Sequence, residues 1–387
     1  MREGWEIKKL GAVCEIVGGS TPKTKEPTYW NGEYYWVTPA DLNGSKYISS
    51  TMRTITDAGI KSAHLQLLPI GTVLLSSRAP IGKVAITTVP MYCNQGFKNL
   101  ICGNTLNNGY AYWFLSHNTH YLNSLGAGAT FKEISKKVVE QIPITIPPLS
   151  EQERIVAELD LLSEVIAKKR EQLKQLDTLA QSIFYDMFGD PITNEKGWET
   201  KKLGDVFQTT SGGTPAKGHN EYYDNGTIPW LRSGEINKMY IYDTELFITE
   251  LGLHNSSAKW FPTNTVVIAM YGATVGQVGI LCKEMTTNQA VCGIFPNDEF
   301  IPIYIYHFLL SKKNEYIEIA AGGAQPNISQ NIVRNTLIYC PPLALQQQFA
   351  SKIEAIEKQK ELIKQSLSEV QLLFDSRMDY YFNEWAE

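Results

Sequence analysis

Several features of enzymes, secreted proteins and membrane proteins are scarce or missing in this 387-residue sequence. The longest apolar runs, such as the one beginning at Ile301, are about half the ~20 residues that span a bilayer. Met1–Leu10 is polar, so we expect no signal peptide. The six cysteines include no C-x-x-C pair, which argues against a zinc site or a disulfide framework. We therefore expect a cytoplasmic protein with reduced thiols, no bound metal and no membrane contact.

Motifs that carry catalysis are also missing. The sequence has no G-x-x-x-x-G-K-[ST] phosphate loop and no strand-linked G-x-G-x-x-G. It also lacks the D/N-P-P-Y/F motif that adenine methyltransferases use on a flipped base, and any local Ser/His/Asp signature. These absences disfavour an independent enzyme, so we predict no catalytic residues.

Charge of one sign does not dominate. The net charge of −5 argues against binding nucleic acid by bulk electrostatics alone. The distribution is uneven: residues 1–149 carry 14 Lys or Arg and 9 Asp or Glu, whereas residues 197–343 carry 10 and 13. An anionic ligand should be attracted more strongly to the first segment than to the second.

What the sequence does contain is one long unit written twice. "GWEIKKLGAVCEIVGGSTP" from Gly4 returns as "GWETKKLGDVFQTTSGGTP" from Gly197, with 11 of 19 positions identical. Later matches, such as "PPLSEQE" from Pro147 with "PPLALQQ" from Pro341, keep an offset of 193 or 194. Two long copies indicate a duplicated domain rather than a solenoid.

Each copy begins with about 145 residues that mix short β-rich runs, Gly/Pro/Asn turns and a few helical stretches. This pattern predicts a mixed α/β (α+β) globular domain. A long heptad stretch follows each domain. We therefore place the boundaries at 1–149 (globular), 150–188 (long helix), 189–343 (globular) and 344–387 (long helix).

The heptad stretches alternate apolar spacings of four and three over about five heptads. In the first, Ser150 and Glu153 form an S-x-x-E capping box and Gly189 supplies the stop. In the second, Ala344 replaces the capping serine, which predicts a weaker start. Two matching stripes favour an antiparallel coiled coil over helices that lie on their own domains. The predicted core is Ile155, Leu159, Leu162, Ile166, Leu173, Leu176, Ile183, Phe349, Ile353, Ile356, Ile363, Leu367, Val370 and Phe374.

Two similar domains joined by two long helices suit a ligand with two separated sites, and DNA is the obvious one. The doubled unit, "PPLSEQERI" from Pro147 and "MFGDPITNEKGWETKKLGDV" from Met187 resemble the specificity subunits of Type I restriction–modification systems over essentially the whole chain. The resemblance implies two target recognition domains, each reading half of a bipartite, asymmetric sequence in double-stranded DNA.

The same resemblance implies partners and a division of labour. The coiled coil sets the gap between the half-sites and docks two modification subunits, which methylate adenine. Restriction subunits with ATP-dependent translocase and nuclease activity can join. The chain itself would be non-catalytic and hold no cofactor, because S-adenosylmethionine, ATP and Mg²⁺ belong to the partners.

Base reading needs polar and cationic side chains aimed into a groove. The repeated pairs Asn94-Gln95 and Asn288-Gln289 suggest a shared structural or backbone role, so unrepeated residues are the better specificity candidates. For the aromatic residues Tyr34, Tyr35, Trp36 and Trp230, core packing is favoured over base stacking. The candidate DNA-binding residues are Thr21, Lys23, Lys25, Ser77, Arg78, Lys83, Asn94, Gln95, Lys98 and Lys132 in the first copy, and Thr214, Lys217, His219, Arg232, Tyr271, Gln277, Asn288, Gln289, Gln325 and Asn327 in the second.

Two alternatives stay open at this point. A coiled-coil scaffold that binds proteins without reading DNA would show no sequence-dependent binding. A nuclease or methyltransferase of unrecognised type would show activity in the isolated chain.

Overall fold

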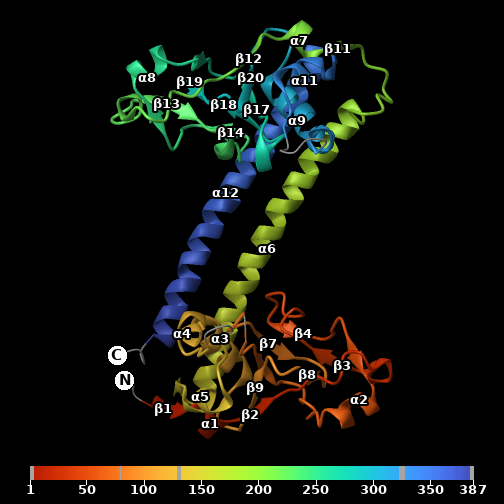
Figure 1. Ribbon diagram of the computed structural model, residues 1–387, viewed down its shortest axis with the longest axis vertical. Helices are drawn as coiled ribbons and strands as arrows, with labels where there is room; N and C mark the ends of the chain where they lie inside the picture. Colours follow the sequence, from red (N-terminus) through yellow and green to blue (C-terminus); the bar gives the residue numbers. More distant parts are fainter. Residues whose placement is uncertain (1–3, 79, 129–131, 322–326, 384–387) are drawn as a thin grey trace. The chain divides into compact units, whose positions relative to one another are not determined.

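The computed structural model describes residues 4–78, 80–128, 132–321 and 327–383. The chain forms two compact units, one from the ranges 1–170 and 365–387 (unit 1) and one from 171–364 (unit 2). Two helices of 40 residues, α6 (Leu149–Phe188) and α12 (Leu343–Phe382), pass through both ranges (Figure 1). At 1.5 Å per residue each is about 60 Å long.

The elements of unit 1 follow one another as a mixture of short strands and short helices. They are β1 (Glu6–Lys9), α1 (Leu10–Val13), β2 (Cys14–Gly18), η1 (Pro27–Tyr29), β3 (Trp30–Val37), β4 (Tyr47–Ile48), β5 (Thr54–Ile55), α2 (Asp57–Ser62), β6 (Val73–Leu75), β7 (Val84–Thr87), β8 (Tyr92–Cys93), β9 (Lys98–Cys102), α3 (Asn108–His117), α4 (Thr119–Ser124), α5 (Lys136–Gln141) and β10 (Pro143–Ile146).

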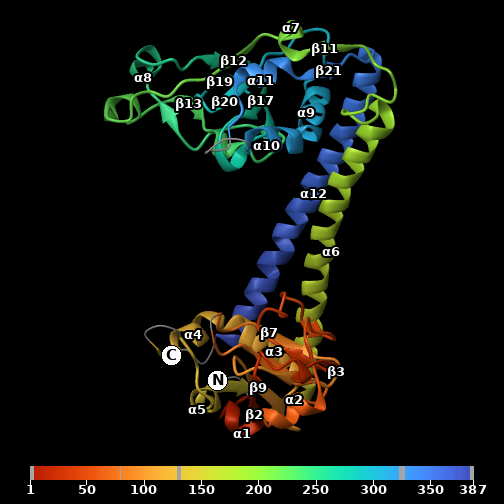
Figure 2. The ribbon, with the colours of Figure 1, turned by 45° about the vertical axis from the view of Figure 1, so that its right-hand side comes forward.

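Unit 2 repeats this series with small changes (Figure 2). Its elements are β11 (Thr200–Lys202), α7 (Leu203–Val206), β12 (Thr209–Ser211), η2 (Asn220–Tyr222), β13 (Ile228–Leu231), η3 (Ser233–Glu235), β14 (Tyr240–Ile241), β15 (Phe247–Ile248), α8 (Glu250–His254), β16 (Trp260–Phe261), β17 (Val266–Ala269), η4 (Gly272–Thr274), β18 (Val278–Leu281), β19 (Met285–Thr287), β20 (Val291–Ile294), α9 (Pro302–Ser311), α10 (Lys313–Ala320), α11 (Gln330–Asn335) and β21 (Leu337–Tyr339).

The sheets show that the duplication extends to topology. A five-stranded sheet has the order β2-β9-β6-β7-β4 in unit 1 and β12-β20-β17-β18-β14 in unit 2. The pair β4·β7 is parallel, as is β14·β18, and the other pairs in these sheets are antiparallel. A second sheet holds β5-β3-β8 in unit 1 and β15-β13-β19-β16 in unit 2. The predicted α+β class with two duplicated domains is confirmed.

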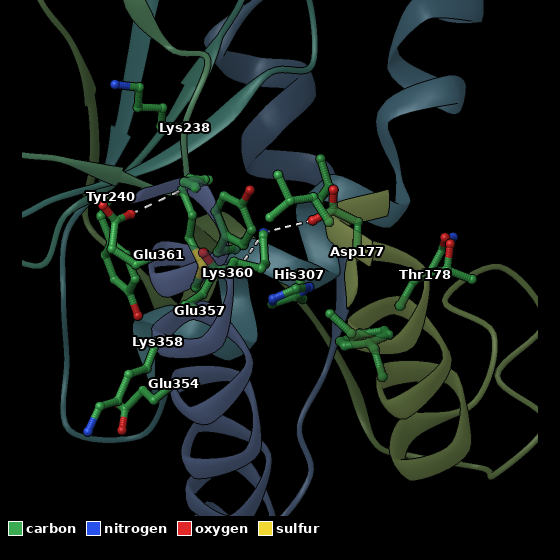
Figure 3. A pocket seen from close by; sticks show the side chains of 18 of the residues that line it. Asp177, Thr178, Lys238, Tyr240, His307, Glu354, Glu357, Lys358, Lys360 and Glu361 are labelled. Carbon is green, nitrogen blue, oxygen red and sulfur yellow. Dashed lines mark hydrogen bonds and ion pairs between the residues drawn. The ribbon is translucent and has the colours of Figure 1, made fainter. Parts of the chain in front are cut away.

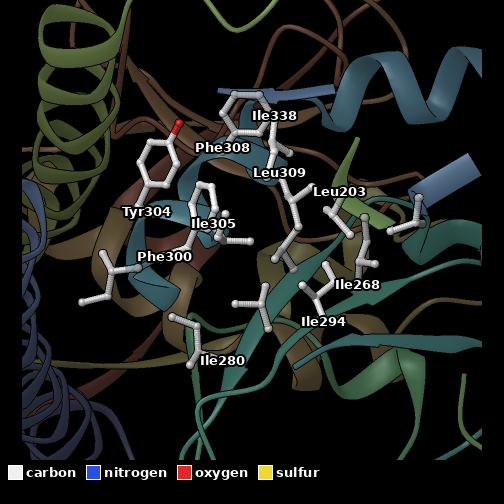
Figure 4. Packing of buried hydrophobic residues seen from close by; sticks show 14 of the residues in the cluster. Leu203, Ile268, Ile280, Ile294, Phe300, Tyr304, Ile305, Phe308, Leu309 and Ile338 are labelled. Carbon is white, nitrogen blue, oxygen red and sulfur yellow. The ribbon is translucent and has the colours of Figure 1, made fainter. Parts of the chain in front are cut away.

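Buried strands and the ends of the long helices form the cores. Strands β7, β17 and β18 are buried along their whole length, which explains their continuous Val/Ile/Leu-rich composition. In unit 2, helix α9 packs on β17 and β18, and its aromatic residues join the strands' aliphatic residues in one cluster (Figure 4). Phe184 and Phe188 of α6 enter this cluster, just as Met378 and Phe382 of α12 enter the core of unit 1.

Within each unit, the start of one long helix packs against the end of the other, so the pair is antiparallel as predicted. In unit 1, the Tyr381 hydroxyl donates to Glu158 at 2.7 Å, and the guanidinium of Arg377 lies 2.9 Å from the same carboxylate. In unit 2, the rings of Phe184 and Phe349 lie 5.6 Å apart.

The helix starts differ from the prediction. α6 begins at Leu149, so Ser150 lies inside the first turn, and the Pro148 carbonyl accepts from the Glu151 and Gln152 amides at 2.9 and 3.0 Å. The capping-box prediction is therefore wrong. α12 begins at the equivalent residue, Leu343, although Ala344 replaces the serine. The predicted stop is correct: Gly189 has a φ of +78°, a conformation that glycine adopts without strain.

A buried glutamine supplies the start signal instead. The Gln152 side chain accepts from the Asn107 amide at 2.8 Å and donates to the carbonyls of Thr105 and Pro147. Gln346 makes the equivalent three bonds in the second copy, accepting from the Ile301 amide at 2.9 Å. Both side chains are buried, so each long helix is fixed at its start to the domain that precedes it.

Candidate functional site

A tight glycine turn follows β2 in unit 1 and β12 in unit 2. A Cβ on Gly19 would lie 2.1 Å from the Cys93 carbonyl oxygen, and one on Gly212 equally close to that of Thr287. Only glycine fits where two backbones approach so closely. The indole of Trp36 donates to the carbonyl of Ser20 at 3.3 Å, and that of Trp230 to Gly213 at 2.9 Å. Both tryptophans are buried and hold this turn in place, as the core-packing interpretation predicts.

The repeated Asn-Gln pairs occupy equivalent positions beside these turns. The Asn94 side chain accepts from the Gly96 amide at 2.9 Å, and the Asn288 side chain from the Ala290 amide at 3.2 Å. The hydroxyls of Thr21 and Thr214 donate to the side-chain oxygens of Gln95 and Gln289, respectively. These contacts give the asparagines a structural role in shaping the turn.

Three predicted cations of unit 1, Arg78, Lys83 and Lys98, lie near this turn. Arg78, Lys83, Asn94 and Gln95 line a cavity of about 370 Å³ together with Thr38, Pro39, Ala40, Pro80 and Gly96. The Lys83 ammonium donates to the Pro39 and Leu42 carbonyls at 2.9 Å each. The Lys98 ammonium lies 3.3 Å from both the Ser77 hydroxyl and the Glu133 carboxylate. The Arg78 Nε is 3.5 Å from the same carboxylate.

In unit 2, the backbone has the same hydrogen-bonding pattern at this place, but the side chains that it carries are different. An antiparallel bridge joins Arg78 to Glu133 in unit 1 and Tyr271 to Asn327 in unit 2. The Ser76 amide donates to the Lys83 carbonyl at 2.9 Å, and the Ala269 amide to that of Gln277 at 2.8 Å. Tyr271, Gln277 and Asn327 therefore stand where unit 1 has Arg78, Lys83 and Glu133. Gln325 lies outside the described residues.

Arg232, predicted as a reader, is bound to two carboxylates. Its Nε lies 3.0 Å from Glu235, and its terminal nitrogen lies 2.6 Å from Glu245. The corresponding position in unit 1 is Thr38, whose amide and hydroxyl donate to Asp41 at 2.8 and 2.7 Å. Both arrangements fold the segment after the tryptophan that the two copies share back on itself.

The other candidates lie on exposed surface. Lys23 and Lys25 precede η1, Lys217 precedes η2, and Lys132 precedes α5. His219 lies 2.8 Å from Glu221, and its ring stacks on that of Tyr222 at 4.8 Å. Tyr34 is also exposed, so the core-packing prediction is wrong for this residue, because its strand β3 turns that side outward.

The predicted coiled-coil positions are the less exposed ones along both helices. Ile155, Leu159, Ile166, Phe349, Ile353 and Ile356 are buried, and the other eight of the predicted core are half-buried. Five of the buried residues, Ile155, Leu159, Phe349, Ile353 and Ile356, belong to the cores of the two domains. Phe184 and Phe188, which the stripe omits, are buried more completely than the stripe residue Ile183 beside them.

A groove of about 1410 Å³ lies in unit 2 between β14, α9 and the two long helices (Figure 3). The ammonium of Lys360 reaches Asp177 at 2.7 Å and Glu357 at 2.6 Å inside it. The His307 ring lies beside these groups, and its buried Nε2 has no hydrogen-bond partner among the described residues.

Two residues that line the groove, Ala180 and His307, are smaller than their equivalents in unit 1. In unit 1, the ring of Trp113 packs 5.5 Å from that of Phe374, and its indole nitrogen donates to Asp160 at 2.9 Å. The duplication offset places His307 at the Trp113 position and Ala180 at the Phe374 position. A histidine therefore replaces a tryptophan, and an alanine replaces a phenylalanine, in the lining of the groove.

The half-buried His307, whose Nε2 is buried, predicts acid-sensitive stability. Burial, together with the positive charge of Lys360, lowers the pKa of His307 to about 4, from ~6.5 in an unfolded chain. The unfolded chain then binds a proton that the folded chain does not. His307 alone should therefore remove on the order of 3 kcal/mol of unfolding free energy as the pH falls from ~6.5 to ~4.

Denaturant unfolding of the wild type and of His307→Phe from pH 7 to pH 4 measures this term. The variant should lose less stability than the wild type over that window, because the carboxylates are common to both. Parallel pH profiles for the two chains would contradict the assignment.

Among the described residues, no group of three or more His, Cys, Asp or Glu side chains is arranged to hold a metal ion. None of the helices in the described part of the chain is long and apolar enough to cross a membrane.

Comparison with known proteins gives consistent matches. The family model described as the Type I restriction modification DNA specificity domain matches twice, at residues 2–177 and 195–372. The MjaIX specificity subunit of a Type I restriction enzyme from Methanocaldococcus jannaschii is 31% identical, over 91% of this chain and 86% of that protein.

Solved structures share the fold. The S subunit of a Type I restriction–modification system from M. genitalium aligns over 98% of this chain and 96% of its own, with a TM-score of 0.62 and 16% identity. A chain from a study of assembly and conformational transition of the type I R-M system aligns over 99% and 98%, with a TM-score of 0.63 and 19% identity. Since the family model covers both copies, the chain belongs to the Type I restriction–modification specificity subunits and contains two of their specificity domains.

Proposed function

We propose that the chain is the DNA-reading subunit of a Type I restriction–modification complex. Each globular domain reads one half of a bipartite, asymmetric target in double-stranded DNA. One observation carries the proposal: the two domains share a backbone frame around the same turn, yet Arg78, Lys83 and Glu133 in one copy face Tyr271, Gln277 and Asn327 in the other. A shared frame with different polar side chains is what two readers of different half-sites require.

The long helices have two roles in this proposal. Because each is anchored at its start by a buried glutamine and at its end by buried aromatic residues, their lengths limit the spacing of the half-sites. We expect their exposed faces to dock two modification subunits, and restriction subunits to join through these. The curated relative is itself named a specificity subunit of a Type I restriction enzyme.

We assign the catalytic steps to the partner subunits. S-adenosylmethionine for adenine-N6 methylation, and ATP with Mg²⁺ for translocation and cleavage, would be bound by the modification and restriction subunits. This chain would be non-catalytic, and its contribution would be to place adenine within reach.

Methylation mapping tests the proposal. The chain is expressed with its modification subunit in a host that lacks adenine methylation, and the genome is sequenced for N6-methyladenine. A single bipartite motif is the expected result. Complex formation without any motif would instead support the protein-binding scaffold, and methylation by the chain alone would support an unrecognised methyltransferase.

Exposed lysines before η1 give a second expected result. The side chains of Lys23 and Lys25 are exposed. In the described part of the chain, the only interaction of either side chain is with Glu26, whose carboxyl pKa is lowered by hydrogen bonding and, to a smaller extent, by the charge of Lys23. The double variant Lys23→Glu/Lys25→Glu should weaken DNA binding by the complex at every sequence, and lower the log–log salt slope by about 2. Lys352→Glu on α12, which is also exposed, serves as the control. Equal effects of the control and the double variant would place no phosphate contact at Lys23 or Lys25.

A further inference from the structure

We infer that Arg78 is a specificity-determining residue of the first domain, that it selects guanine in the half-site, and that Glu133 is the residue that positions it. The inference rests on the proposed function, because it assigns a base to a domain that reads DNA. It goes further in naming one side chain, its base and its support.

Arg78 is more accessible to a ligand than the other cations around the cavity. Lys83 is committed to two backbone carbonyls at 2.9 Å. The Lys98 side chain is only 14% exposed and is held between Ser77 and Glu133. The Arg78 side chain is 45% exposed. Its terminal nitrogens donate no hydrogen bond to any described residue, so they can bind a ligand.

The Glu133 carboxylate comes nearest to the Nε atom of Arg78 and not to the two terminal nitrogens, which form the fork of the guanidinium group. The carboxylate meets Nε at 3.5 Å, while its other oxygen lies 3.3 Å from Lys98. A bridge between the two backbones places Arg78 and Glu133 opposite each other. The Glu133 charge and the backbone bridge therefore hold the Arg78 side chain near its Nε atom. Both terminal nitrogens extend beyond that contact.

Hydrogen bonding by the arginine fork selects the base. Guanine presents two acceptors, N7 and O6, on its major-groove edge, and an arginine fork binds both. Cytosine presents an amino donor there, and adenine presents an amino donor beside its N7 acceptor, so neither offers two acceptors to the arginine fork. Thymine offers one acceptor beside a methyl group, so it satisfies half of the fork.

Unit 2 supplies an internal comparison. At the Arg78 position it has Tyr271, and Glu133 is replaced by Asn327. Its own cation in this region, Arg232, is bound through Nε and a terminal nitrogen to Glu235 and Glu245. Arg232 therefore lacks the free fork that Arg78 has, and Arg232→Ala is a matched control.

The test uses the complete complex with its modification subunits. Binding to duplexes that carry every single-base substitution of the wild-type motif is measured for the wild type, Arg78→Lys, Arg78→Ala, Glu133→Gln and Arg232→Ala. In the wild type, one half-site should contain a guanine at which substitution weakens binding by about ten- to a hundredfold. Both Arg78 variants should lose that discrimination, and Arg78→Lys should lose it despite its charge, because an ammonium lacks the fork.

Glu133→Gln should relax the same position alone, with the remaining positions read as before. A purely structural role for Glu133 would instead lower the melting temperature and weaken binding equally at every position. Arg232→Ala should leave the guanine position unchanged.

Three outcomes would overturn the inference: no guanine position that depends on Arg78, full discrimination retained in Arg78→Lys, or a uniform loss in Arg78→Ala that marks a phosphate contact. Its failure is distinct from that of the proposed function. A wild-type complex without a bipartite motif removes the proposed function, whereas a normal motif that is insensitive to Arg78 removes only this assignment.

Discussion

Insertion of one heptad after Arg170 in α6 alone should abolish methylation at the wild-type motif. The reason is that both ends of this helix are fixed. Its start is held in unit 1 by Gln152 and Ile155, and its end in unit 2 by Phe184 and Phe188. Seven residues add about 10.5 Å to α6, while α12 keeps its length, so one of the four anchored ends must leave its site.

Methylome sequencing of cells that express the variant complex measures the effect. Methylation at the wild-type motif should fall by about a hundredfold or more, because losing one half-site removes several base contacts worth roughly 1–3 kcal/mol each.

A matched variant separates spacing from unfolding. A second heptad after Lys364 of α12 restores equal helix lengths, and the heptad period preserves the seam. This doubly extended chain should direct methylation to the same two half-sites with a longer spacer. Continued methylation of the original motif by the singly extended chain would mean that the helices do not set the spacing.

The sequence was most informative where the physics is local and periodic. A 3.5-residue repeat sustained over five heptads, written twice, defines two long helices whatever else surrounds them. A constant offset of 193 or 194 likewise defines two domains of one fold. The strand order could not be predicted, because the pairing of β2 with β9 or of β4 with β7 joins segments that are far apart in the chain.

Residues that act through burial were missed. Gln152 and Gln346 fix the helix starts, yet an isolated glutamine in a polar helix gives no local signal. The available signal was their recurrence at the offset of 194, while the neighbouring Ser150 changed to Ala344. Position-by-position comparison of the copies would have favoured the glutamine over the serine as the start signal.

The sequence predicted only part of the candidate site, and the reason is related. Arg78, Lys83 and Lys98 are predicted DNA-binding residues because they are cations, and the structure brings them close to the same turn. Glu133, which holds two of them, was not selected because a carboxylate disfavours contact with DNA. Its role depends on distances of 3.3 and 3.5 Å across a bridge between distant segments, and no sequence pattern contains these.

Phe184→Ala should be among the most destabilising substitutions in the long helices. The Phe184 ring is 2% exposed and lies among the rings of Phe188, Tyr304 and Phe349 at 5.2, 6.0 and 5.6 Å. Truncation leaves a cavity in a cluster that joins α6 to α9 and α12, so we expect a loss of about 3–5 kcal/mol in unfolding free energy.

Denaturant unfolding measures this loss, with Leu179→Ala on the same helix as the control. Leu179 is 46% exposed, so its truncation should cost less than about 1 kcal/mol. The heptad stripe omits both residues, and the difference between them therefore comes from tertiary packing alone. A loss at Phe184 no larger than that at Leu179 would mean that the end of α6 rests on the surface of the second domain rather than in its core. Under the proposed function, the helix could then not fix the distance to the half-site that this domain would read.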